Sequence, residues 1–277
     1  MASARFGCVD GRAVLITDSL TSYVDIEKFS SGKLPSEPMA CLERWSEVCK
    51  VAASLSPTDD LNAIALNANK LECPVPRPRQ IFAIGINYKA HAAEMNNPLP
   101  KEPLVFTKFQ SSLNSPNGSL TLVGEKCDFE AELVAVIAKG GRNILADEAW
   151  GHVAGLCVGQ DVSDRALQYA NTPPQFSLGK SRAGFTPIGP WITDAASLTT
   201  RANLEMTCRV SGEIMQHTQT DDMIFEIPEI ISYLSTICEL FSGDVIYTGT
   251  PSGVGAGRTP QRFLRSGDVI ETTIQDL

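Results

Sequence analysis

The chain has 277 residues, of which 43% are apolar and 20% are charged, and its formal net charge is -9. This composition is ordinary for a globular protein with a large core, and it excludes disordered and collagen-like chains. The 23 Lys and Arg residues are outnumbered by 32 Asp and Glu and form no cluster, so we expect no nucleic-acid partner. No apolar run approaches the ~20 residues needed to cross a bilayer, so we expect no membrane segment.

Two further features bear on where the protein resides. The N-terminal residues lack the long apolar stretch of a secretory signal, which predicts a cytoplasmic protein. The eight cysteines are widely spread and contain no C-x-x-C pair. We therefore expect reduced thiols, and neither disulfide bonds nor a zinc site.

The chain divides into two predicted parts joined by a proline-rich segment. Residues 4–18 alternate around a tight turn and predict a hairpin, and residues 39–55 carry apolar side chains at helical spacing. Together they indicate a small N-terminal α/β module over residues 1–73. The prolines of residues 74–79 favour an extended linker, because proline cannot continue a helix. Residues 80–277 then form the predicted catalytic domain.

Residues 80–277 are predicted to be an α+β domain dominated by strands. Segments rich in β-branched and aromatic residues, bounded by Gly, Pro or Asp, predict strands at 81–87, 103–109, 127–139, 153–159, 189–194, 204–216 and 244–255. The clearest helix is predicted over residues 220–240, capped by Thr220 or Asp221, with a break or second start at Pro228. The strands and helices do not alternate, which argues against a parallel βαβ fold.

Three acidic residues form a candidate metal site. Glu130 and Glu132 alternate with apolar residues in a predicted strand, so both carboxylates share one face. Two neighbouring carboxylates repel each other unless a cation lies between them. Asp161 ends the next predicted strand and could supply a third oxygen to Mg²⁺ or Mn²⁺. The alternatives are an exposed pair of glutamates on an edge strand and an aspartate that serves a turn.

Candidate acid–base and cationic groups lie on either side of these acids. His91 and Glu94 are three residues apart in a predicted helical turn, where a carboxylate can orient an imidazole as a general base. Lys108 and Lys180 stand among apolar or small residues and could bind a substrate carboxylate or a developing oxyanion. The alternatives are a solvated His–Glu pair and lysines that extend to solvent.

Several segments in the same order along residues 80–275 resemble the fumarylacetoacetate hydrolase family. They are IGINYKAHAAEM, PLVFTKF, DFEAEL, GQDVSDRALQ, SLGKS, PIGPWI, QTDDMIFEIPEIISYLS and GDVIYTGTPSGVG. Residues 1–73 resemble the variable N-terminal module of longer bacterial-type members. The resemblance implies a mixed β-sandwich roll and a homodimer.

The resemblance also implies roles for individual residues. It implies Mg²⁺ or Mn²⁺ held by Glu130, Glu132 and Asp161, and a His91–Glu94 dyad with Lys180 in the active site. It further implies substrate contacts by Arg165, Gln168 and Thr250. The chain departs from the family pattern at Asp164, Ala166 and residues 182–184, where Arg182 could contact an anionic group.

The implied reaction is metal-dependent hydrolysis of a carbon–carbon bond in a 2,4-diketo acid of the acylpyruvate or fumarylpyruvate type. His91 and Glu94 would activate water, and Lys180 would stabilise the pyruvate enolate that leaves. Decarboxylation of oxaloacetate is an alternative, since it forms the same enolate without an attacking water. A catalytically silent metal-binding protein is a third possibility.

Overall fold

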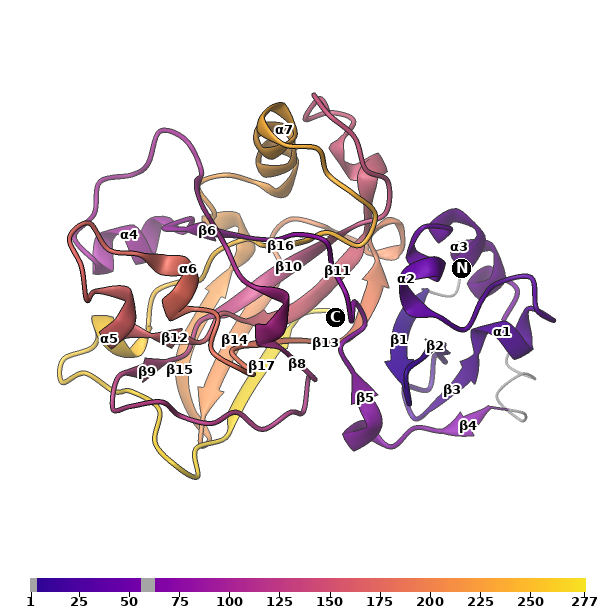
Figure 1. Ribbon diagram of the computed structural model, residues 1–277, viewed down its shortest axis with the longest axis horizontal. Helices are drawn as coiled ribbons and strands as arrows, with labels where there is room; N and C mark the ends of the chain where they lie inside the picture. The colour runs from indigo at the N-terminus through magenta and orange to yellow at the C-terminus, as the bar shows by residue number, and fades with distance from the viewer. Residues whose placement is uncertain (1–3, 56–62) are drawn as a thin grey trace.

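The computed structural model describes residues 4–55 and 63–277, and strands dominate it (Figure 1). Twelve of its strands form one large mixed sheet. The main path through this sheet is β4 (Ile64–Ala65), β3 (Ser22–Asp25), β2 (Arg12–Ile16), β1 (Arg5–Val9), β13 (Thr186–Asp194), β11 (Val153–Gln160), β10 (Ala131–Ile137), β16 (Val245–Tyr247), β6 (Ile81–Gly85) and β7 (Leu104–Thr107). The predicted strand-dominated α+β class is confirmed.

The remaining strands and the helices are short. Within the large sheet, β5 (Leu71–Glu72) pairs with β1, and β8 (Leu113–Asn114) pairs with β13. A second sheet has the order β15 (Glu213–Gln219), β14 (Glu205–Val210) and β17 (Ile270–Ile274), and β9 (Cys127–Asp128) pairs with β12 (Ser163–Asp164). The helices are α1 (Ile26–Phe29), α2 (Pro38–Leu42), α3 (Trp45–Ala53), α4 (Lys89–Glu94), α5 (Arg165–Gln168), α6 (Phe176–Gly179) and α7 (Ile227–Ile237).

Strand β10 is buried on both faces, which explains its nearly continuous apolar sequence. Leu133 and Ala135 join a core cluster that also contains residues of α7 and the second sheet. Val134 and Val136 point the other way, into a cluster shared with the N-terminal helices. Glu132 is the one charged residue of β10 and lies on the same face as Val134. A carboxylate in such a strand requires a polar or cationic partner.

The predicted N-terminal hairpin is confirmed, because β1 and β2 pair in register. The single helix predicted over residues 39–55 is wrong: α2 and α3 are separate, with Arg44 outside helical geometry between them. Strand β1 also pairs with β13, so the N-terminal strands continue the large sheet. The division into residues 1–73, 74–79 and 80–277 stays a prediction, and its residues 1–3 and 56–62 lie outside the described residues.

Two predicted boundaries in the C-terminal half are corrected. Helix α7 starts at Ile227 and not at residue 220, in agreement with the second start predicted at Pro228. Glu226 and Glu229 form a reciprocal capping box there, and Pro228 suits the first turn. The segment 204–216 predicted as one strand instead contributes to two antiparallel strands, β14 and β15. They turn at Ser211 and Gly212, which both have positive φ.

Two of the negative predictions concern disulfide bonds and membrane segments. Each of the eight cysteines is a free thiol, as expected. In the described part of the chain, no helix has the length and apolar character that crossing a membrane would need.

Asp244 fixes the end of the proline-rich segment to the start of β16. Its buried carboxylate accepts hydrogen bonds from the backbone N–H and side-chain amide of Gln80, at 3.0 and 2.7 Å, and from the N–H of Phe241 at 2.8 Å. Burial outweighs these donors and raises the pKa of Asp244 to about 6. The charged form of this carboxyl is therefore disfavoured in the folded protein.

The raised pKa of Asp244 predicts a pH-dependent stability. The unfolded chain has an Asp pKa of roughly 4, so between about pH 4 and 6 the folded protein holds a proton that the unfolded chain has released. The stabilisation is fully present below pH ~4 and is lost as the pH rises through about 6. Relative to Asp244→Asn, we expect the wild type to lose about 2 kcal/mol of unfolding free energy between pH 4 and 7. Urea unfolding at each pH measures this difference, and a constant difference would contradict the raised pKa.

Candidate active site

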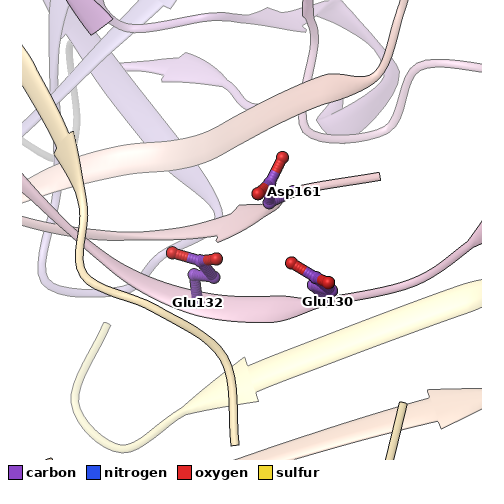
Figure 2. Close-up of side chains that lie close together, drawn as sticks. All are labelled: Glu130, Glu132 and Asp161. Atoms are coloured by element: carbon purple, nitrogen blue, oxygen red, sulfur yellow. The ribbon is translucent and has the colours of Figure 1, made fainter. Parts of the chain in front are cut away.

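The three predicted metal-binding carboxylates lie close together where β10 begins and β11 ends (Figure 2). Glu130 directly precedes β10, Glu132 lies within it, and Asp161 directly follows β11. The antiparallel register pairs Ala131 with Gln160, so these strand ends are neighbours. The N–H of Asp161 donates to the carbonyl of Glu130 at 2.9 Å. One oxygen from each carboxylate lies within 4.8 Å of the others, and all three residues are buried.

Buried cations contact two of these carboxylates. The ammonium of Lys180 donates to Glu130 and to Asp161, each at 2.6 Å. Lys108 forms an ion pair with the other oxygen of Asp161. Arg165 contacts Glu130 at 2.6 Å. Burial alone would raise the pKa of Glu130, but Lys180 and Arg165 outweigh it and lower that pKa to about 2.

Glu132 lacks such compensation. Its carboxylate accepts a hydrogen bond from the N–H of Gly249 at 2.7 Å. No ion pair in residues 4–55 and 63–277 involves Glu132. Burial, followed by repulsion from Asp161 and Glu130, raises its pKa well above the usual range. An all-oxygen donor set in which one buried carboxylate is only partly compensated fits a hard divalent cation such as Mg²⁺ or Mn²⁺.

The predicted dyad forms on helix α4. His91 and Glu94 are one helical turn apart, and Nδ1–H of His91 donates to Oε2 of Glu94 at 2.9 Å. The N–H of Gly253 donates to Oε1 of Glu94 at 2.8 Å. With the proton on Nδ1, the Nε2 of neutral His91 carries the lone pair. His91 is only 7% exposed, which excludes the alternative of a solvated surface pair.

Helix α4 is docked against the C-terminal half of the chain. The side-chain amide of Asn87 donates to the carbonyls of Phe225 and Thr248, at 3.0 and 2.7 Å. The N–H of Ala90 donates to Asp222 at 3.0 Å. These contacts fix the helix that carries the dyad, and His91 lines the same pocket as Glu130 and Glu132.

A pocket of about 190 Å³ brings most of the candidate residues together. It is lined by His91, Glu130, Glu132, Arg165, Gln168, Lys180 and Thr250. Glu94 and Asp161 contact this set through His91 and Lys180. The rest of the wall is largely apolar, with side chains of Ile84, Ile86, Met95, Phe106, Tyr169, Pro174 and Phe176. The pocket therefore has one strongly charged end and one apolar side.

Two predicted substrate contacts have other partners. Lys108 is not among the residues that line the pocket. Its ammonium donates to Asp161 and to the carbonyls of Lys180 and Phe185, which engages all three protons. The Thr250 hydroxyl donates to the carbonyl of Ala131 and accepts from Gln216. Their roles in substrate binding stay predictions, while their contacts indicate that they support Asp161 and β10.

Two of the departures from the family pattern contact each other. The guanidinium of Arg182 donates to the Asp164 carboxylate at 2.9 Å. The other oxygen of Asp164 caps α5 by accepting from the N–H of Leu167 at 3.1 Å. Arg182 therefore has an anionic partner within the protein, and the pair joins the segment after Lys180 to the helix that carries Arg165.

Asp128 is a site residue that the sequence reasoning missed. Its buried carboxylate accepts from Nε of Arg165 at 2.9 Å and from the N–H groups of Gly255 and Ala256, at 2.7 and 3.1 Å. The signal was present, because Asp128 stands two residues before Glu130 and continues its alternation. The hydrogen bond from the N–H of Gly249 to Glu132 is likewise not predicted by the sequence pattern.

The chain resembles known proteins in sequence and in fold. A family model described as the C-terminal part of fumarylacetoacetate hydrolase matches residues 80–277. Mitochondrial oxaloacetate tautomerase FAHD2A of Bos taurus is 42% identical over 206 residues, which are 74% of this chain and 66% of that protein. The match thus spans just under two thirds of that relative's length.

Solved structures share the fold over nearly the whole chain. A Mycobacterium smegmatis protein provisionally named HpcE has a TM-score of 0.89 and 42% identity, and the match covers 98% of this chain and 95% of the M. smegmatis chain. Maleylpyruvate hydrolase from Sphingobium sp. SYK-6 was solved with manganese(II) and pyruvate. It has a TM-score of 0.78 and 26% identity, and the match covers 98% of this chain and 94% of the hydrolase chain. The predicted fold is confirmed, and the chain belongs to the fumarylacetoacetate hydrolase family.

Proposed function

We propose that the chain is a divalent-metal-dependent enzyme that converts a 2-keto acid through its enolate. The observation that carries this proposal is the buried His91–Glu94 dyad in the same pocket as Glu130 and Glu132. A base and an anion-stabilising centre in one pocket are what proton removal next to a carbonyl requires. The same arrangement makes a catalytically silent member a poor explanation.

Each of the candidate residues in and around the pocket can be assigned one role in the reaction. Mg²⁺ or Mn²⁺ held by Glu130, Glu132 and Asp161 would polarise a 2-keto oxygen as a Lewis acid. Nε2 of His91 would take a proton from C3 of the substrate and deliver a proton to the resulting enolate oxygen, or carry out the reverse transfer. Glu94 would keep the imidazole oriented and stabilise its protonated form. The ammonium of Lys180 would offset the negative charge on the enolate oxygen or the substrate carboxylate.

Oxaloacetate is the substrate that we propose first, with keto–enol tautomerisation as the reaction. Tautomerisation requires one group that exchanges a proton between C3 and the keto oxygen, and His91 can serve as that group. The 42% identity to a protein named oxaloacetate tautomerase supports this choice. It was not among the reactions predicted from the sequence.

Hydrolysis of an acylpyruvate is the second candidate. His91 would remove a proton from water, which attacks the distal carbonyl, and the carbon–carbon bond would break to leave the pyruvate enolate. The acid–base dyad supports this reaction because it can activate water. The likeness to a maleylpyruvate hydrolase solved with pyruvate also supports it. Decarboxylation of oxaloacetate passes through the same enolate and is a third outcome of the same assays.

One panel of assays separates these reactions. The purified protein with Mg²⁺ or Mn²⁺ is given oxaloacetate and, separately, a series of acylpyruvates. Three signals are followed: the absorbance of the enol, the release of pyruvate, and the release of the carboxylic acid that derives from the acyl group. We expect accelerated decay of the oxaloacetate enol without stoichiometric pyruvate. Faster acylpyruvate cleavage than tautomerisation would instead favour the hydrolase. Activity that persists after chelation would contradict both.

The remaining expectations concern the whole protein. We propose that it forms a homodimer, which light scattering after gel filtration would measure. The cytoplasmic location also stays a prediction, and the name of the FAHD2A relative places that protein in mitochondria.

A further inference from the structure

The segment after β16 encloses the carboxylate of Glu94. Gly253 donates its N–H to Oε1 of Glu94 at 2.8 Å, while Oε2 accepts from Nδ1 of His91 at 2.9 Å. Both oxygens are therefore held, one by the loop and one by the imidazole. Moving this carboxylate would break at least one of the two contacts.

Gly257 lies against the same carboxylate. A Cβ added there would come within 2.5 Å of Cδ, 2.7 Å of Oε1 and 2.8 Å of Cγ of Glu94. Such separations are far below van der Waals contact. The φ of Gly257 is not in the left-handed region, so its backbone does not itself require glycine. The Glu94 side chain thus fills the space that a Cβ at this position would need.

The loop is also tied to the carboxylate cluster. Asp128 accepts from the N–H groups of Gly255 and Ala256, at 2.7 and 3.1 Å, and from Arg165 at 2.9 Å. Arg165 in turn contacts Glu130 at 2.6 Å. One continuous set of buried contacts thus connects a metal-site carboxylate to the loop that holds Glu94.

We propose that residues 249–257 set the position of the dyad relative to the carboxylates, and that Gly257 is a positioning residue that acts through Glu94. Its contribution to catalysis rests on the proposed function, because His91 must be the group that moves the proton. A Cβ at residue 257 would push the Glu94 carboxylate away from Gly253 or His91. The imidazole would then lose the acceptor that fixes its tautomer and orientation.

The first test is Gly257→Ala, compared with Gly151→Ala. Apart from its chain neighbours and the backbone of its own helical turn, no described atom lies within 4 Å of a Cβ at Gly151, and its φ is also outside the left-handed region, so it is a matched control. We expect Gly257→Ala to lower kcat about 10²-fold with KM and Mn²⁺ affinity within about twofold of the wild type. Gly151→Ala should match the wild type. A kcat within twofold of the wild type in Gly257→Ala would overturn the proposal.

The second test asks whether the effect passes through Glu94. In a Glu94→Ala background the obstructing carboxylate is absent, so Gly257→Ala should lower kcat no further. An equal loss in both backgrounds would mean that Gly257 acts on the fold in general, and would overturn the proposal. If Gly257→Ala alone fails to fold, the double variant with Glu94→Ala should fold. Failure of both variants to fold would also mean that Gly257 acts on the fold in general, and would overturn the proposal.

A third readout does not depend on activity. The chain has three histidines, so the Nδ1–H resonance of His91 can be assigned by its loss in His91→Ala. We expect a low-field, hydrogen-bonded Nδ1–H signal in the wild type and in Gly151→Ala, and its loss in Gly257→Ala. An unchanged signal would contradict the positioning role. Full activity in His91→Ala would reject the proposed function while leaving this measurement as the test of the loop.

Discussion

Glu132→Gln is expected to abolish activity and weaken Mn²⁺ binding by at least about 10²-fold, while making the metal-free protein more stable. The loss follows from removing one of three charged oxygen donors. The gain follows because burial and repulsion from Asp161 and Glu130 oppose the charge of Glu132. The variant should therefore unfold at a higher temperature than the wild type after chelation, and should gain little from added metal.

Calorimetric Mn²⁺ titration and thermal unfolding with and without chelator measure both effects. Glu213→Gln is a suitable control, because Glu213 is an exposed glutamate on β15. It should leave metal affinity and activity unchanged. A Glu132→Gln protein that binds Mn²⁺ as tightly as the wild type would show that the three carboxylates do not hold the metal.

His91→Ala is expected to lower turnover about 10²-fold or more with Mn²⁺ affinity unchanged. His91 lines the pocket and carries an imidazole, a common general acid and base, and its Nε2 is not the nitrogen that contacts Glu94. Lys180→Ala should also lower turnover, because its ammonium is assigned to the charge on the enolate oxygen or the substrate carboxylate. It should not weaken Mn²⁺ binding, since the change removes a cation that contacts Glu130 and Asp161.

The two variants are compared by steady-state assays at saturating metal and by metal titration. His152→Ala is the control for replacing a histidine, because that side chain contacts the carbonyl of Lys139, away from the pocket. If His91→Ala turned over at the wild-type rate, the dyad would not be the acid–base group.

Local patterns were sufficient to predict part of the site. The alternation around Glu130 and Glu132 fixes that their side chains share a face, because period two is intrinsic to a strand. The three-residue spacing of His91 and Glu94 likewise follows from one helical turn. The placement of Asp161 beside Glu130 is different, since it depends on the register that pairs Ala131 with Gln160. The position of Asp161 at the end of a predicted strand makes it a candidate ligand, and the register places it beside Glu130.

Other features depend on contacts between distant segments. Lys180 and Lys108 were predicted to bind a substrate anion, yet both contact Asp161, because folding brings three segments to one strand end. The fit of Gly257 against Glu94 joins residues over 160 positions apart, and no spacing rule reveals it. The break between α2 and α3 was missed because the apolar spacing continues across it.

Exchange of the C3 protons of pyruvate in D₂O tests the central claim most directly, because it measures enolate formation without presupposing which reaction follows. Proton NMR with Mg²⁺ follows the loss of the methyl signal. We predict exchange well above the rate with Mg²⁺ alone, and its loss after chelation, in Glu132→Gln and in His91→Ala. Exchange no faster than with Mg²⁺ alone, or equally fast in the chelated protein, would contradict a metal-dependent enolate site.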